Sequence, residues 1–220
     1  KVLVFGGNRF MGKALVDKLL QCNFNVTLFN RSGTGSSKTT VLKGDRNSTN
    51  DLKKINFEEY DYIFDMCLFK PEQYKLIEKD LIKSNPKKYI FISSAAVGNK
   101  HFGDYAIEKE QVEDLIKNTK LNYTIFRPVY VVGENSHRPR LGWYINKLIK
   151  KEPLSIYGKG NSFLNLVHVD DVVKVLIDSM TNIKYENKTT ILSNGQNLTH
   201  CGIIDKISNF LNIKEFNTIY

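Results

Sequence analysis

Three side chains in the middle of the chain have the types and spacing needed to move a proton and a hydride: Ser94, Tyr105 and Lys109. Tyr105 and Lys109 are four residues apart, so a helix would put both on one face. A phenol has a pKa of about 10, and its use as a base near pH 7 requires about 4 kcal/mol of stabilisation of the phenolate. A neighbouring ammonium and a positively charged nicotinamide can supply it, while Ser94 holds a substrate oxygen.

The setting of these residues carries more weight than their spacing. In a lysine-rich chain, a Tyr-x-x-x-Lys match often arises by chance. Here the match follows an apolar run, residues 88–94, that ends in two serines, and the chain opens with a glycine-rich turn. Together these features favour redox chemistry with a bound dinucleotide.

The first twelve residues predict a phosphate-binding turn. Residues 2–5 form a short apolar run typical of a buried strand, and the helix that follows would present free N–H groups to a pyrophosphate. Arg9 stands where a middle glycine is expected: its side chain can grip a phosphate, or its Cβ can hold the backbone away from one. The residues expected to line the cofactor site here are Gly6, Gly7, Asn8, Arg9, Phe10, Met11 and Gly12.

Strand-like and helix-like segments alternate along the first 128 residues. The further predicted strands are residues 25–30, 39–45, 60–66, 88–94 and 122–128. The further predicted helices are residues 51–55, 71–84 and 104–118. This alternation predicts an α/β fold, a doubly wound parallel sheet of the Rossmann type with strand order 3-2-1-4-5-6, and residues 189–195 offer an extra strand.

The pattern loosens after Pro128, which indicates two parts. We expect a dinucleotide-binding domain and a small substrate-side region that is open to continuation beyond Tyr220. The domain takes residues 1–134 and 164–195, and the substrate-side region takes residues 135–163 and 196–220. Within the second part, residues 153–162 predict a hairpin.

His168 begins another segment that predicts a helix. We expect His168 to be structural and Asp170 or Asp171 to cap the helix that follows it.

Composition narrows the class of protein. The chain has 220 residues, 41% of them hydrophobic, which suffices for one sizeable core. It holds no apolar run long enough to span a membrane and no signal sequence, so we expect a cytoplasmic protein. Its 3 cysteines lack paired spacing and offer no zinc site. The net charge of +9 is spread along the chain and mixed with acids, which favours a solvated surface over a nucleic-acid face.

Several longer segments resemble the extended short-chain dehydrogenase/reductase family, which includes nucleotide-sugar epimerases and dehydratases. They are FGGNRFMG at the start, GDR at 44–46, YIFISSAAVG at 89–98 and YAIEKEQVE at 105–113, which includes Glu113. The resemblance implies an NAD(P)-dependent oxidoreductase or epimerase that acts at a hydroxyl or ketone carbon of a nucleotide-sugar-like substrate. It implies that Ser94, Tyr105 and Lys109 are catalytic and that Asp45 meets the adenine amino group.

Departures from the family pattern limit what the resemblance implies. The glycine motif with Arg9 resembles that of the chloroplast stem-loop RNA-binding proteins, an atypical branch. Ala95 and Ala96 stand where dehydratases have an Asp-Glu pair, which argues against dehydration. Leu164 and Asn165 replace an Arg-Asp pair, so a usual partner of the nucleotide phosphates is missing. The alternative function is therefore a dinucleotide-regulated RNA-binding or scaffold protein without turnover.

The end of the second predicted strand bears on the cofactor. An NAD-selective site needs a carboxylate there, and this chain has Asn30, followed by Arg31 and Ser32. With Arg9 these residues favour NADP over NAD, because guanidinium groups bind a 2′-phosphate; Arg31 stacked on adenine or lying in solvent is the alternative. The remaining expected cofactor contacts are Asp45, Arg46, Met66, Cys67, Lys109, Pro128 and Tyr130.

The expected partners are a small-molecule substrate and a second copy of the chain. Besides Ser94, the basic residues His137, Arg138 and Arg140 are candidates to bind a substrate phosphate, and a solvated loop is the alternative. The family resemblance suggests a homodimer through residues 71–84 and 104–118. RNA as a partner is disfavoured but open.

Overall fold

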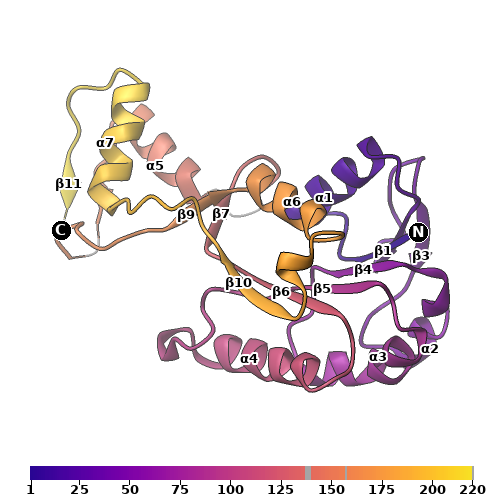
Figure 1. The fold of residues 1–220 in the computed structure, drawn as a ribbon. Helices are drawn as coiled ribbons and strands as arrows, with labels where there is room; N and C mark the ends of the chain where they lie inside the picture. Colours follow the sequence, from indigo (N-terminus) through magenta and orange to yellow (C-terminus); the bar gives the residue numbers. More distant parts are fainter. Residues whose placement is uncertain (137–139, 157, 220) are drawn as a thin grey trace.

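The computed structural model describes residues 1–136, 140–156 and 158–219, and its centre is a seven-stranded parallel sheet (Figure 1). The strands lie in the order β10-β6-β5-β4-β1-β2-β3. Their bounds are β1 (Val2–Phe5), β2 (Val26–Asn30), β3 (Thr40–Lys43), β4 (Tyr62–Asp65), β5 (Lys88–Ile92), β6 (Tyr123–Pro128) and β10 (Lys188–Leu192). The predicted strand order is confirmed, and the extra strand is β10, which pairs with β6.

Helices cover both faces of the sheet (Figure 1). Their bounds are α1 (Phe10–Gln21), α2 (Thr49–Leu52), α3 (Pro71–Ser84), α4 (Gly103–Lys117) and α6 (Val169–Asp178). α1 and α6 pack together on one face, and α2, α3 and α4 cover the other. Every residue of β1 and β5 is buried, as a sheet covered on both sides requires.

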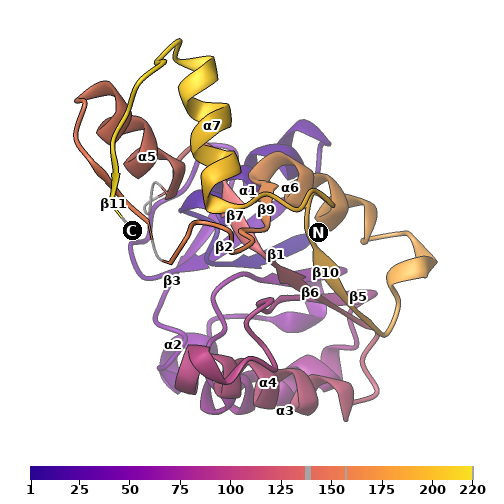
Figure 2. The same ribbon diagram turned by 90° about the vertical axis from the view of Figure 1, so that its left-hand side faces the viewer.

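A smaller layer from the last third of the chain stands to one side of the sheet (Figures 1 and 2). Its elements are α5 (Arg140–Ile149), β8 (Leu154–Ser155), α7 (His200–Phe210) and β11 (Thr218–Ile219). They enclose their own apolar cluster around Leu148, Leu154 and Ile204. A short parallel pair, β7 (Tyr130–Val132) with β9 (Leu166–His168), joins this layer to the sheet.

Three short 3-10 helices complete the described elements. They are η1 (Phe57–Glu59), η2 (Lys100–Phe102) and η3 (Ile183–Tyr185). None of the helices in the described ranges is long and apolar enough to cross a membrane.

Two local predictions are wrong. Among the described residues of 153–162 no hairpin pairing is present; β8 pairs in parallel with β11 instead. The cap of α6 is the side chain of His168, whose Nδ1 accepts a hydrogen bond from the N–H of Asp170 at 3.3 Å. Asp170 and Asp171 lie in the first turn of the helix instead. The pairing of β8 depends on a strand far along the chain, and the cap of α6 depends on the orientation of the His168 ring. A local sequence pattern indicates neither.

The start of α1 lies very close to the turn after β1. A Cβ on Gly12 would stand 2.0 Å from the carbonyl oxygen of Gly6. No methyl group tolerates that distance, so glycine at this position is what lets the helix N-terminus approach the strand end.

We expect Gly12→Ala to lower the free energy of unfolding by about 3 kcal/mol, because the helix must move away from β1. Urea denaturation followed by circular dichroism measures the change. Gly202→Ala in α7 is the control: its nearest heavy atom would lie at 3.3 Å, and alanine favours a helix. A Gly12→Ala protein as stable as the wild type would contradict the close packing.

Candidate functional site

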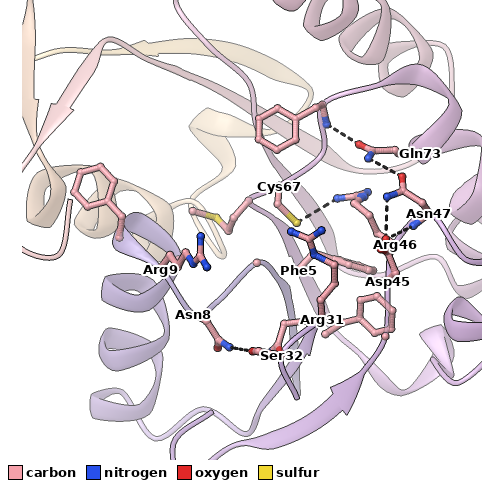
Figure 3. A pocket seen from close by; sticks show the side chains of 18 of the residues that line it. Phe5, Asn8, Arg9, Arg31, Ser32, Asp45, Arg46, Asn47, Cys67 and Gln73 are labelled. Atoms are coloured by element: carbon pink, nitrogen blue, oxygen red, sulfur yellow. Dashed lines mark hydrogen bonds between the residues drawn. The ribbon is translucent and has the colours of Figure 1, made fainter. Parts of the chain in front are cut away.

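A cavity of about 880 Å³ opens at the carboxyl ends of β1, β2, β3 and β4 (Figure 3). The strand order reverses between β1 and β4, and open α/β sheets bind ligands at such a point. The predicted cofactor residues that line it are Gly6, Asn8, Arg9, Phe10, Met11, Gly12, Asn30, Arg31, Ser32, Asp45, Arg46, Met66 and Cys67. The lining is completed by six residues that the sequence did not predict for the site: Phe5, Phe29, Gly44, Asn47, Phe69 and Gln73.

The glycine turn forms one wall of the cavity. Gly6 has a φ of 80°, which favours glycine, whereas Arg9 has extended backbone with φ −134° and ψ 143°. Arg9 therefore costs no backbone strain where a glycine was expected. The left-handed conformation falls instead on Phe10, with φ 43°. No side chain caps α1; the N–H of Gly12 donates to the carbonyl oxygen of Arg9 at 3.0 Å, and the N–H groups of Phe10 and Met11 have no partner in the described ranges.

Two guanidinium groups extend into the cavity from different elements, Arg9 from the turn and Arg31 from the end of β2 (Figure 3). Within the described part of the chain, neither has a hydrogen-bond or ion-pair partner. Arg31 also lines a second cavity of about 380 Å³ that adjoins the first. The other residues of this second cavity are Lys43, Gly44, Asp45, Asp51 and Lys54. Cations thus predominate at the β2 and β3 side of the site.

The loop after β2 is joined by side-chain hydrogen bonds and carries no carboxylate. The Asn30 side chain accepts a hydrogen bond from the N–H of Gly33 at 2.8 Å and donates one to the carbonyl oxygen of Thr34 at 2.9 Å. The Ser32 hydroxyl donates to Asn30 at 2.9 Å and accepts from the side-chain amide of Asn8 at 3.0 Å. This network joins the loop to the glycine turn.

Arg46 is buried beneath the cavity in an ion pair with Asp65. Two hydrogen bonds of 2.7 and 2.9 Å join the guanidinium to the carboxylate, which also accepts from the Tyr89 hydroxyl at 3.1 Å. Burial opposes the charge of Arg46, but the Asp65 carboxylate raises the pKa of this guanidinium above its ordinary value. Burial and the same carboxylate raise the pKa of Tyr89. Arg46 lines the cavity with a side chain that is already paired.

A chain of polar side chains forms the wall between β3 and α3. Asp45 accepts hydrogen bonds from the N–H and the side-chain amide of Asn47, both at 2.8 Å. The Gln73 amide donates to Asn47 at 2.9 Å (Figure 3). Gln73 also accepts from the N–H groups of Phe69 and Lys70, which fixes the loop before α3.

The three predicted catalytic residues lie beyond the lining of this cavity. Ser94 follows β5, and its hydroxyl accepts a hydrogen bond from the N–H of Ala96 at 3.1 Å. Tyr105, on α4, is 40% exposed, whereas Lys109 is 2% exposed.

The Lys109 ammonium is held by backbone carbonyl groups. It donates to Leu68 at 2.6 Å and to Ile92 at 2.8 Å. Burial lowers the pKa of Lys109 to about 8, and the Asp65 carboxylate opposes this effect. No hydrogen bond joins Lys109 to Tyr105 among the described residues, so the helix aligns the pair without direct contact.

A buried carboxylate on α4 fixes this helix against the sheet. Glu113 accepts a hydrogen bond from the Ser93 hydroxyl at 2.6 Å and two from Arg127 at 2.8 and 2.7 Å. Burial raises the pKa of Glu113, but hydrogen bonds from Arg127, Ser93 and Lys117 bring it below its usual value. The sequence contained Glu113 as part of a motif, but two of its partners, Ser93 after β5 and Arg127 in β6, could not be deduced from spacing; Lys117, four residues on in α4, could.

We expect Glu113→Gln to destabilise the protein at pH 7 by at least about 2 kcal/mol, because charged hydrogen bonds are lost. The folded pKa lies below the unfolded value of 4.5, so the stabilisation is present above that value and falls as pH drops through the folded pKa. Urea unfolding between pH 7 and 3.5 should therefore show a flatter dependence in the variant. Glu110→Gln, on an exposed turn of α4, is the control.

The other predicted contacts lie near the substrate-side layer. Pro128 ends β6 and Tyr130 begins β7, and neither lines the cavity. The Arg140 guanidinium stacks on the Tyr130 ring at 4.1 Å from its centroid. His137 and Arg138 lie outside the described residues.

Sequence comparison assigns this site to a family. The NAD(P)H-binding family matches residues 6–182, which is most of the chain and includes the glycine turn, the cavity and α4. The chain belongs to the NAD(P)H-binding family. Among curated proteins it is similar to the chloroplast stem-loop binding protein of 41 kDa b from Arabidopsis thaliana, 27% identical over 92% of this chain and 61% of that protein. The chain thus spans about three fifths of that relative.

Two solved structures share the fold of this NAD(P)H-binding chain. A UDP-glucose 4-epimerase from Thermotoga maritima, solved with UDP-glucose, matches with a TM-score of 0.82 at 19% identity, over 99% of this chain and 85% of that one. An enzyme from Bordetella bronchiseptica, solved with NAD and UDP, matches with a TM-score of 0.80 at 12% identity, over 100% of this chain and 82% of that one. The resemblance to the extended short-chain dehydrogenase/reductase family is confirmed.

Proposed function

We propose that the protein is an NAD(P)-dependent epimerase or oxidoreductase that acts at a hydroxyl or ketone carbon. The proposal rests on one observation in a chain of the NAD(P)H-binding family. Ser94 follows β5, the strand beside β4, and Tyr105 and Lys109 lie on the next helix, α4. A protein that only bound a ligand would have no physical need for this alignment.

The cavity fits a dinucleotide. Its volume of about 880 Å³ is sufficient, the start of α1 lacks a side-chain cap, and Arg9 and Arg31 supply positive charge. The first turn of α1 and Arg9 would hold the pyrophosphate, and Asp45 would accept a hydrogen bond from the adenine amino group. A dinucleotide held there would supply the chemistry of hydride transfer at the reacting carbon.

The chain's own groups move the proton. Ser94 binds the substrate oxygen through its hydroxyl, and Tyr105 holds or releases the proton at that oxygen. The Lys109 ammonium, fixed by two carbonyl groups, would supply positive charge next to the reacting groups.

A nucleotide-sugar-like substrate is supported by what the similar structures contain. The Thermotoga enzyme was solved with UDP-glucose and the Bordetella enzyme with UDP. Arg140, stacked on Tyr130 at the start of α5, would bind a substrate phosphate. Arg140 would supply the positive charge that is missing where Leu164 and Asn165 replace the Arg-Asp pair.

We expect Tyr105→Phe to lower turnover about 100-fold or more while dinucleotide binding stays within twofold, because only the proton-transfer group is lost. UDP-glucose, with NAD or NADP, is the first substrate to assay. Tyr62→Phe, at the opposite end of the sheet on β4, is the control. Full turnover by Tyr105→Phe would refute the mechanism.

We also propose NADP as the preferred cofactor. The loop after β2 holds Asn30 and Ser32 in an uncharged network, and Arg31 faces the site free of any partner in the described ranges. A 2′-phosphate would meet the Arg31 guanidinium there, and the loop itself carries no carboxylate, whereas Asp45 and Asp51 line the adjoining cavity together with Lys43 and Lys54. The Bordetella enzyme was solved with NAD, so the preference rests on this chain's own residues.

Arg31→Gln should weaken NADPH binding about tenfold or more and leave NADH binding within twofold, because a charged hydrogen bond to the 2′-phosphate is lost. Quenching of protein fluorescence measures both affinities. Lys18→Gln, on α1, is the control for net charge. Equal losses for both cofactors would mean that Arg31 serves the adenine or the pyrophosphate instead.

RNA binding without turnover is the second candidate function. The Arabidopsis relative is named as a stem-loop binding protein, and the chain carries a net charge of +9. An RNA affinity that falls steeply with salt would support it, and no binding at low salt would eliminate it. Pairing of two copies through α3 and α4 stays a prediction that sedimentation can test.

A further inference from the structure

Phe69 stands between the cavity and the predicted catalytic pair. It lines the cavity from the loop between β4 and α3, and 45% of its surface is exposed. Its ring centroid lies 6.5 Å from that of Tyr105 and 4.8 Å from the Lys109 ammonium. No other residue of the cavity lining has a ring or ion contact with either Tyr105 or Lys109 among the described residues.

The ring is exposed although its backbone is fixed. The N–H of Phe69 donates to Gln73 at 2.9 Å, and the carbonyl oxygen of the preceding Leu68 accepts the Lys109 ammonium. The following residue, Lys70, pairs with Glu108 of α4 at 3.4 Å. Three consecutive residues thus dock on α3 and α4. An apolar ring held open in this way is suited to contact a planar ligand.

Resting on the proposed function, we propose that Phe69 is a positioning residue for the reaction. One part of its ring forms the wall on which the nicotinamide end of the cofactor lies, and the other contacts Tyr105 and Lys109. The residue therefore sets the separation between the hydride carrier and the groups that handle the proton. Because an aromatic face also attracts the ammonium, Phe69 favours the charged form of Lys109.

Phe69→Leu tests both roles, since leucine keeps an apolar side chain and loses the aromatic face. We expect NADPH and NADH to bind threefold to tenfold more weakly, measured by fluorescence titration. Phe69→Tyr should restore both affinities to within twofold. Phe210→Leu, which removes an exposed ring from α7, is the matched control and should change neither affinity.

The second readout needs no cofactor and no turnover. In the free protein, NMR titration of labelled lysine, assigned with Lys109→Arg, should give a pKa of Lys109 about half a pH unit lower in Phe69→Leu. Other groups that act on the Lys109 ammonium are unchanged in this variant: Asp65, Arg46, Cys67 and Glu113. The Phe91 ring, whose centroid lies 4.8 Å from the Lys109 ammonium, is also unchanged in this variant.

The outcomes separate the two proposals. If the wild type binds a dinucleotide but Phe69→Leu changes neither its affinity nor the pKa of Lys109, Phe69 only packs on α4 and the inference is overturned. If the wild type binds no dinucleotide, the proposed function fails, whatever the pKa of Lys109 does. Weaker binding together with a lower pKa, both reversed in Phe69→Tyr, supports the inference.

Discussion

The site depends on a buried negative charge. The Asp65 carboxylate has no solvent exposure, so it needs a partner inside the protein. Arg46 supplies two hydrogen bonds, and Tyr89 adds a third. Because Arg46 follows β3 and Asp65 ends β4, this ion pair sets the spacing of two walls of the cavity. The residues that line the cavity after β3 keep their positions as a consequence.

The same principle recurs along the carboxyl edge of the sheet. The buried ammonium of Lys109 joins the loop after β4 to the end of β5 through two carbonyl oxygens. The buried carboxylate of Glu113 joins β5, α4 and β6 through Ser93 and Arg127. The crossings from β4 to β5 and from β5 to β6 are therefore each held by a buried charge whose partners come from both sides. Such contacts are directional, which suits a site where distances matter.

The sheet could be predicted because burial on both faces leaves apolar runs in the sequence, and right-handed crossovers leave few strand orders. The two features that were predicted wrongly, the hairpin and the cap of α6, lack such a signal. β8 has two residues, and its partner β11 lies far along the chain, so no turn signal could reveal the pair. His168 caps α6 through a ring nitrogen, although carboxylates next to it are the commoner caps. The pattern predicts a glycine at Arg9, and only the structure shows that the backbone there is extended, a conformation open to any residue.

The sequence by itself determined the fold class, the strand order, the glycine-rich turn between β1 and α1 and the alignment of Tyr105 with Lys109, because these follow from local periodicity and short spacing. Only the tertiary structure decided that Arg46 is paired within the protein, that Lys109 is held by carbonyl groups, and that Phe69 separates the cavity from α4. The physical reason is that a charged or aromatic side chain takes the partner that folding brings near it. That partner usually lies on another strand or helix.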